Sequence, residues 1–87
     1  MATQVAMRTM LYESIQNKND EKLRLYSEWA EKYVIKKPEP KIYEEWILAE
    51  FNLNEHTKAC HIVTKAKGLH PNYNPFIKWT NNECSVP

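Results

Sequence analysis

The sequence predicts an all-α protein, a small bundle of four to five short antiparallel helices. Apolar residues recur at the three- and four-residue spacing of amphipathic helices through most of the chain. No segment shows the sustained alternation of apolar and polar residues that a half-buried strand requires. The 87 residues include a single glycine, Gly68, whereas a many-stranded protein usually needs several in its tight turns.

A short polar break separates the first two expected helices. The first helix runs from about residue 2 to residue 16. The second follows Asp20, which we expect to be its N-cap, because a short polar side chain there accepts a hydrogen bond from the first turn. It should end near Ile35, since Pro38 and Pro40 follow and a residue before proline avoids the helical conformation.

The remaining chain predicts two further helices and a short fifth one. Pro40 fits the first turn of the third helix, where its missing N–H costs nothing. Asn54 is expected to cap the fourth helix, and Gly68 to end it in the left-handed conformation. A short helix over residues 74–79 and a frayed tail from about residue 82 complete a single domain over residues 1–87.

Composition and charge indicate a folded intracellular domain. Apolar residues make up 43% and charged residues 26% of the chain, and the formal net charge is +1. A charge so close to zero does not favour a protein that coats nucleic acid or an acidic membrane. No stretch approaches the roughly 18 apolar residues of a membrane span. We therefore expect no membrane partner. Two cysteines are too few for a disulfide scaffold, so a reducing compartment, cytoplasmic or nuclear, is expected.

An internal period appears in the second half of the chain. Pro40 and Pro75 are 35 residues apart, a length typical of two-helix repeats. The residues that carry the pattern are Trp46, Glu50, Ala59, Val63, Ala66 and Pro71. Residues 40–79 resemble a tetratricopeptide or half-a-TPR repeat, and the resemblance implies a helix-hairpin repeat that binds other proteins. Two departures are the short spacing from Trp46 to Ala59 and the carboxylate of Glu50 where the family has a small residue.

No pattern in the sequence predicts catalysis or a cofactor. No Ser–His–acid spacing and no paired-carboxylate cleft is evident. Glu44, Glu45 and Glu50 share the third helix, and two of the three are expected to face solvent. Glu50 falls within the apolar arc, where we expect a Tyr or Lys partner, or else a role as an anchor for a partner molecule.

Four residues are candidate zinc ligands: His56, Cys60, His70 and Cys84. His56 and Cys60 are four residues apart, which can place two ligands on one side of a helix. No Cys-x-x-Cys pair accompanies them, so no metal is predicted, and Cys60 is more simply interpreted as a small buried residue.

The abundance of aromatic residues suggests the favoured function. Three Trp, five Tyr and two Phe are many for a core of this size, and Trp and Tyr often supply interface energy. We therefore predict a non-enzymatic module that binds a protein, a peptide or its own copy between adjacent helices. The residues expected to do so are Trp29, Tyr33, Tyr43, Trp46, Glu50 and Trp79.

Two alternatives stay open. One is a small nucleic-acid-binding or regulatory protein that uses Lys32, Lys36, Lys37 and Lys41 beside aromatic residues. Seven acidic residues between Glu21 and Glu50 oppose a continuous basic groove. The other is an accessory protein of a virus or mobile element that inhibits a host factor.

Overall fold

Five α-helices and no strand form the part of the chain that the computed structural model describes, residues 3–85. The helices are α1 (Gln4–Asn17), α2 (Asp20–Lys36), α3 (Pro40–Asn52), α4 (His56–Leu69) and α5 (Asn74–Asn81). The predicted all-α class is confirmed. Residue 2, the expected start of the first helix, lies outside the described residues.

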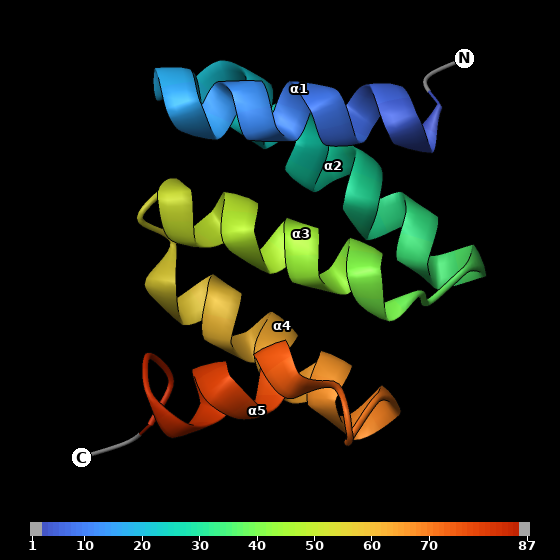
Figure 1. The fold of residues 1–87 in the computed structure, drawn as a ribbon, viewed down its shortest axis with the longest axis vertical. Coiled ribbons are helices and arrows are strands. Elements are labelled where there is room, and N and C mark those ends of the chain that lie inside the picture. Colours follow the sequence, from blue (N-terminus) through green and yellow to red (C-terminus); the bar gives the residue numbers. More distant parts are fainter. Residues whose placement is uncertain (1–2, 86–87) are drawn as a thin grey trace.

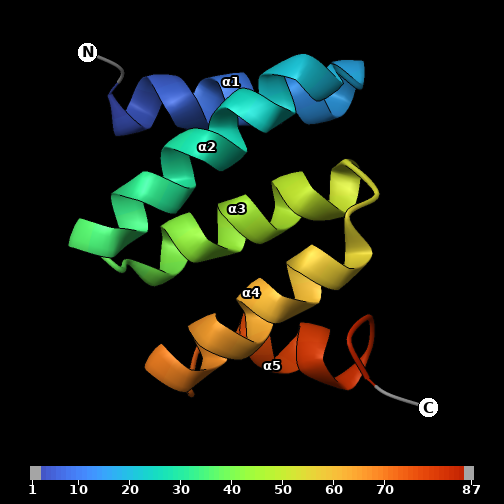
Figure 2. The ribbon, with the colours of Figure 1, turned by 180° about the vertical axis from the view of Figure 1, so that it is seen from behind.

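The helices follow one another in an antiparallel zigzag (Figure 1). α3 lies at the centre and packs against α1, α2 and α4, while α5 packs against α4. Two edges result, as the view from behind also shows (Figure 2). One edge holds the start of α1, the α2–α3 turn and the α4–α5 turn. The α1–α2 turn and the α3–α4 turn lie at the other.

The core is continuous and comes from all five helices. Tyr26, Ile42, Ile47 and Phe76 are fully buried, and each belongs to the apolar side of its helix. Three fully buried alanines, Ala49, Ala59 and Ala66, lie on α3 and α4. Small side chains allow two helix backbones to approach closely, so these alanines suit the contact between the two helices.

Local sequence explains where the helices begin. The side chains of Thr3 and Asn19 accept hydrogen bonds from the first turns of α1 and α2. Asn19 is therefore the N-cap of α2, and Asp20, the predicted cap, is its first helical residue. Pro40 and Pro75 lie in the first turns of α3 and α5, where proline is tolerated.

Two predicted helix ends are wrong. Gly68 lies inside α4, which continues through Leu69, and its φ is not positive. Asn54 has φ 61°, so it occupies the left-handed turn, and Glu55 precedes α4 without a side-chain cap bond. The left-handed residue at the α3–α4 turn is thus an asparagine, which tolerates that conformation through its short polar side chain.

The segment after α5 is tied back to the helices. A disulfide joins Cys60 on α4 to Cys84. The backbone N–H of Cys84 also donates to the carbonyl oxygen of Trp79 (2.8 Å). Residues 82–85 of the predicted frayed tail are anchored at this point, and residues 86–87 lie outside the described residues. The disulfide differs from the reducing compartment that the sequence predicts, in which both cysteines would be free thiols.

Candidate functional site

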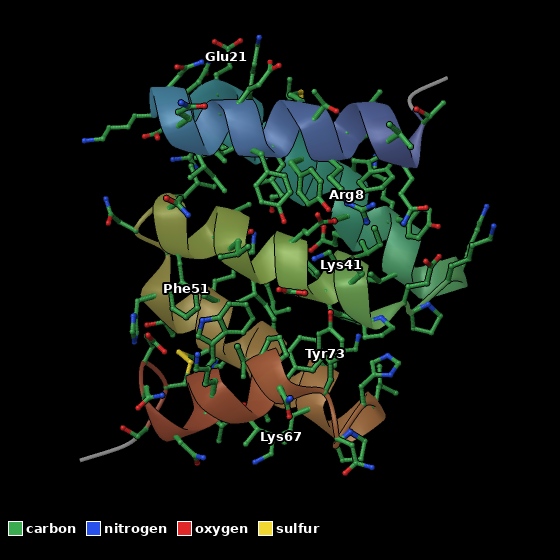
Figure 3. The ribbon with its side chains drawn as sticks, in the orientation of Figure 1. Arg8, Glu21, Lys41, Phe51, Lys67 and Tyr73 are labelled. Carbon is green, nitrogen blue, oxygen red and sulfur yellow. A yellow bond between two sulfur atoms is a disulfide. The ribbon has the colours of Figure 1, made fainter. Side chains whose placement is uncertain are left out.

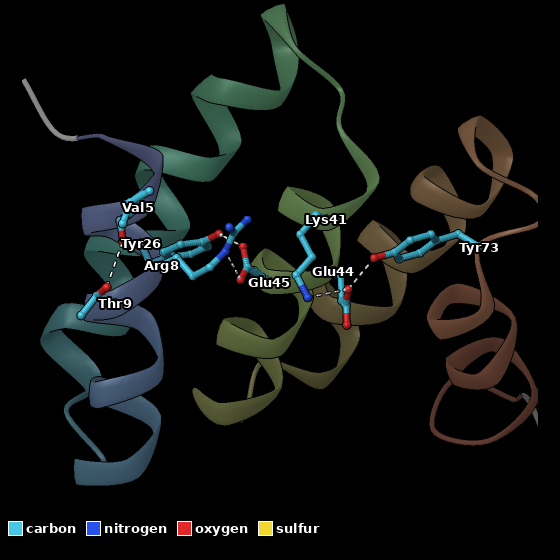
Figure 4. A network of polar contacts seen from close by, with 8 residues as sticks. All are labelled: Val5, Arg8, Thr9, Tyr26, Lys41, Glu44, Glu45 and Tyr73. Atoms are coloured by element: carbon cyan, nitrogen blue, oxygen red, sulfur yellow. Dashed lines mark hydrogen bonds and ion pairs between the residues drawn. The ribbon is translucent and has the colours of Figure 1, made fainter.

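Three glutamates on α3 connect it to the surrounding helices. Glu45 is fully buried and accepts from Arg8 Nε on α1 (2.7 Å) and from the Tyr26 hydroxyl on α2 (3.2 Å). Arg8 extends from α1 toward α3, as Figure 3 shows, and the contacts are drawn in Figure 4. A buried carboxylate needs such compensation because burial strips it of water.

Charge and burial raise the pKa values of the two donors of this cluster, Arg8 and Tyr26. The hydrogen bond from Arg8 to Glu45 raises the pKa of the Arg8 guanidinium, so the arginine keeps its charge. Burial, followed by the negative charge of Glu45, raises the pKa of Tyr26, so its phenol stays protonated and donates. The cluster is therefore a stable ion pair with a neutral third member.

Glu50 forms a second buried cluster, one turn and a half further along α3. It accepts hydrogen bonds from the Ser27 hydroxyl and from Trp46 Nε1 (3.1 Å), and it forms an ion pair with Lys58 Nζ (3.1 Å). Ser27 lies on α2 and Lys58 on α4, so one carboxylate links three helices. The expectation of a lysine partner for Glu50 agrees with the Lys58 contact.

Glu44 makes the third connection. The Tyr73 hydroxyl, just before α5, donates to Glu44 (2.6 Å), and Lys41 Nζ lies 3.5 Å from the same carboxylate (Figure 4). Burial and this hydrogen bond raise the pKa of Tyr73 to about 12. The phenol therefore remains a donor throughout the physiological range.

A polar cleft of about 280 Å³ opens beside Glu50, and we call it the Glu50 cleft. It is lined by residues of α2, α3, the α3–α4 turn and the first turn of α4: Arg24, Ser27, Glu28, Glu50, Leu53, Glu55 and Lys58. Leu53 is the one apolar side chain among them. Two cations, three carboxylates and a hydroxyl supply donors and acceptors around one space, which suits a polar, hydrogen-bonding ligand without large apolar surface.

A second hollow of about 440 Å³ lies beside α5. Its lining combines one half-buried aromatic ring with amides and charges: Glu44, Asn74, Pro75, Lys78, Trp79, Asn82 and Glu83. It shares Glu44 with the third connection of α3. It does not meet the Glu50 cleft, whose lining residues are all different.

The predicted aromatic site residues do not form one surface. Tyr43 and Trp46 are 2% and 7% exposed, so both belong to the core. Trp29 and Tyr33 are half-buried neighbours on α2 with ring centroids 4.9 Å apart. Trp79 lines the hollow beside α5 instead. The structure therefore pairs Trp29 with Tyr33 and Tyr43 with Trp46. It places Trp79 apart from both pairs, so these residues form no common groove.

The other predicted residues are placed as follows. Lys32, Lys36, Lys37 and Lys41 surround the α2–α3 turn, and Lys41 is paired with Glu44. His70 Nε2 lies 2.7 Å from the Pro38 carbonyl oxygen. Cys60 and Cys84 are consumed by the disulfide, and residues 3–85 hold no cluster of three or more His, Cys, Asp or Glu side chains that would bind a metal.

Sequence reasoning missed the Glu45 cluster. Glu45 was expected among the solvent-facing glutamates of the third helix, and the structure buries it completely. Its partners Arg8 and Tyr26 are 37 and 19 residues away in the sequence. The available signal was Arg8, the one charged side chain among residues 1–12, but nothing in the sequence identifies Glu45 as its partner.

The comparisons give one family and no individual relative. A family model described as "Virulence factor membrane-bound polymerase, C-terminal" matches residues 5–82. No curated protein and no solved structure matches the chain. Within residues 3–85, every helix is too short or too polar to cross a membrane.

This match corrects several expectations from the sequence. The matching family is not a tetratricopeptide-like repeat, so the family expected from the resemblance over residues 40–79 is wrong. A membrane-bound polymerase is an enzyme associated with a membrane. The predictions of a non-enzymatic interaction module, of an intracellular location and of no membrane partner are therefore wrong. So are the two alternatives, a nucleic-acid-binding protein and an accessory protein of a virus or mobile element. The physical reason is that helix length and aromatic content describe a fold, and one fold serves many functions.

Proposed function

The chain belongs to the family of C-terminal regions of virulence-factor membrane-bound polymerases, and we propose that it works as the C-terminal domain of such a polymerase. The observation that carries the proposal is the match over residues 5–82, which includes all of the helical core. In this role the domain presents the Glu50 cleft to a polar segment of the polymer on which the enzyme acts.

The chemistry of the Glu50 cleft supports this role. Ser27 and Lys58 are held in place by the buried carboxylate of Glu50, so the wall of the cleft is fixed before a ligand arrives. Arg24, Glu28 and Glu55 are exposed around it. A preorganised wall spares the ordering entropy that a flexible site would lose on binding.

The disulfide supports a location on the oxidising side of the membrane. Disulfides persist outside the cytosol and are rare within it, because cytosolic thiols are kept reduced. Cys60 and Cys84 are the two cysteines of the chain, and both are paired. The domain would thus meet the polymer where it leaves the cell interior.

The test compares polymer made by cells whose polymerase carries altered domains. The double variant Arg24→Gln/Glu28→Gln replaces two exposed charged groups of the cleft by neutral amides without changing the net charge. We expect shorter or less abundant polymer at an unchanged level of enzyme, because the cleft holds the polymer less tightly.

The matched control is Glu13→Gln/Lys22→Gln, which makes the same charge changes at exposed positions outside the cleft. It should leave the polymer unchanged. Equal polymer from the cleft variant and from wild type would contradict the role of the cleft. Unchanged polymer after deletion of the whole domain would contradict the proposed function itself.

A further inference from the structure

The charges of the molecule are divided between its two edges. We define the basic edge as residues 3–8, 31–41 and 65–73, which comprise the start of α1, the α2–α3 turn and the α4–α5 turn with the helix ends beside them. It carries seven of the twelve Lys and Arg and two of the eleven Asp and Glu, a formal charge of +5. The rest of the chain carries −4. The net charge of +1 therefore conceals a strongly dipolar molecule.

The basic edge also exposes large apolar side chains. Val5, Ile35 and Leu69 are 71%, 79% and 51% exposed. They stand near the start of α1, near the end of α2 and at the end of α4, the three places where helices meet this edge (Figure 1). They are three of the five large apolar side chains that residues 3–85 expose, and the other two are Tyr12 and Leu25. One exposed leucine or isoleucine is ordinary, but three at the same edge of a small domain favour a surface that another molecule covers.

The turns of this edge are held together. His70 Nε2, in the α4–α5 turn, lies 2.7 Å from the Pro38 carbonyl oxygen, in the α2–α3 turn. Glu39, one of the two acids, accepts the Tyr33 hydroxyl (2.6 Å), which raises the pKa of that phenol. Arg8 and Lys41 are paired with Glu45 and Glu44. The remaining lysines make no ion pair with residues 3–85: Lys32, Lys36, Lys37, Lys65 and Lys67.

We propose that the basic edge rests on the anionic lipid headgroups of the membrane that carries the polymerase. Lysines near an anionic membrane each contribute about 1 kcal/mol of attraction. Exposed apolar side chains beside them enter the boundary between headgroups and acyl chains. A soluble polyanion would match the lysines and leave Val5, Ile35 and Leu69 in water. A lipid surface matches both.

The position of α1 agrees with this orientation. The inference rests on the proposed function, in which the domain follows the membrane-bound part of a polymerase. α1 begins at the basic edge (Figures 1 and 2). In that arrangement the attachment to the membrane and the basic edge lie on the same side of the domain. The Glu50 cleft involves the other end of α3 and the start of α4, so it faces away from the membrane.

The experiment measures binding of the 87-residue chain to vesicles. Vesicles rich in phosphatidylglycerol should retain the protein on sedimentation, vesicles of pure phosphatidylcholine should not, and salt should weaken the binding. Lys36→Gln/Lys37→Gln should weaken it roughly 30-fold, as expected for the loss of two lysines near the surface. Ile35→Ser/Leu69→Ser should weaken it as well, with less dependence on salt.

The matched control is Lys22→Gln/Lys78→Gln, which removes two exposed lysines outside the basic edge. It should bind like wild type, and circular dichroism of all three variants should show an unchanged fold. Equal weakening by both lysine pairs, or no binding to phosphatidylglycerol vesicles, would overturn the inference. The polymer assay with the cleft variants is independent of this result, so failure of the lipid contact is distinguishable from failure of the proposed function.

Discussion

Glu45 shows how much one buried charge can matter in a small domain. Its carboxylate is completely enclosed, and its two partners come from α1 and α2. Arg8 keeps about a third of its side chain exposed, so the ion pair is buried on the acid side alone. Loss of this ion pair would therefore leave the Glu45 carboxylate buried without a cationic partner, whereas the Arg8 guanidinium would still reach water.

Replacement of Glu45 by Ala should lower the free energy of unfolding by about 2 kcal/mol, because it leaves the Tyr26 hydroxyl buried without an acceptor and Arg8 without its acid. Urea denaturation of both proteins measures the difference. Glu13→Ala, at an exposed position, is the control and should change stability by less than about 0.5 kcal/mol. A similar loss in both variants would show that the buried cluster has no special role.

Gly68 provides the opposite case, a residue whose replacement should help. It lies inside α4 without a positive φ, and a Cβ added there would meet no atom within 4 Å. Gly68→Ala should therefore raise the free energy of unfolding by about 0.5–1 kcal/mol, because alanine loses less backbone entropy in a helix. Thermal melting checks this. A lower melting temperature would mean that the glycine is needed for a conformation absent from this structure.

At the scale of single residues, the sequence predicts what local patterns control. The position of Glu50 within the apolar arc of α3 was visible from helical spacing, and its burial follows. Glu45 could not be identified in the same way, because its partners are distant in the chain and its own wheel position indicates solvent. Tertiary contacts decided the burial of this side chain.

At the scale of helices, most boundaries follow from caps and prolines. Pro40 and Pro75 mark two helix starts, as the sequence predicts. The ends of α3 and α4 were less predictable, because Asn54 and Gly68 both favour a left-handed turn and the sequence does not say which one adopts it. Packing of the adjoining helices makes that choice.

α5 is the helix that depends most on a covalent bond. It has eight residues, packs against α4, and is followed directly by the disulfide from Cys84 to Cys60. Reduction should cost about 3–4 kcal/mol by the chain-entropy argument for a loop of this length. It should also release α5 before the other helices, because an isolated helix of this length is not stable.

Hydrogen exchange measured with and without a reductant tests this order. Amide protection should fall in residues 74–81 while α3 remains protected. The variant Cys60→Ala/Cys84→Ala should behave like the reduced protein and respond no further to reductant. Equal protection of α5 in the oxidised and reduced proteins would show that Phe76, which is fully buried, is a sufficient anchor on its own.

At the scale of the whole molecule, the sequence predicts the architecture and not the biological setting. Five amphipathic segments joined by short turns define the zigzag, since neighbouring helices with short connections pack antiparallel. The near-zero net charge suggested no membrane contact, yet the charges separate once the helix ends are gathered at two edges. Only the three-dimensional arrangement reveals that separation.

The proposed location on the oxidising side of a membrane predicts the oxidation state of Cys60 and Cys84. If the domain lies on the oxidising side of a membrane, Cys60 and Cys84 should be paired in the polymerase isolated from its host, with alkylating reagent present at lysis. Mass spectrometry should show no alkylated cysteine until the protein is reduced. The chain produced in a reducing cytoplasm should react twice and melt at a lower temperature.

Cys84→Ser, with one thiol left, should react once in either setting. Two free thiols in the host polymerase would place the domain on the reducing side, because the geometry allows the bond to form wherever an oxidant is available.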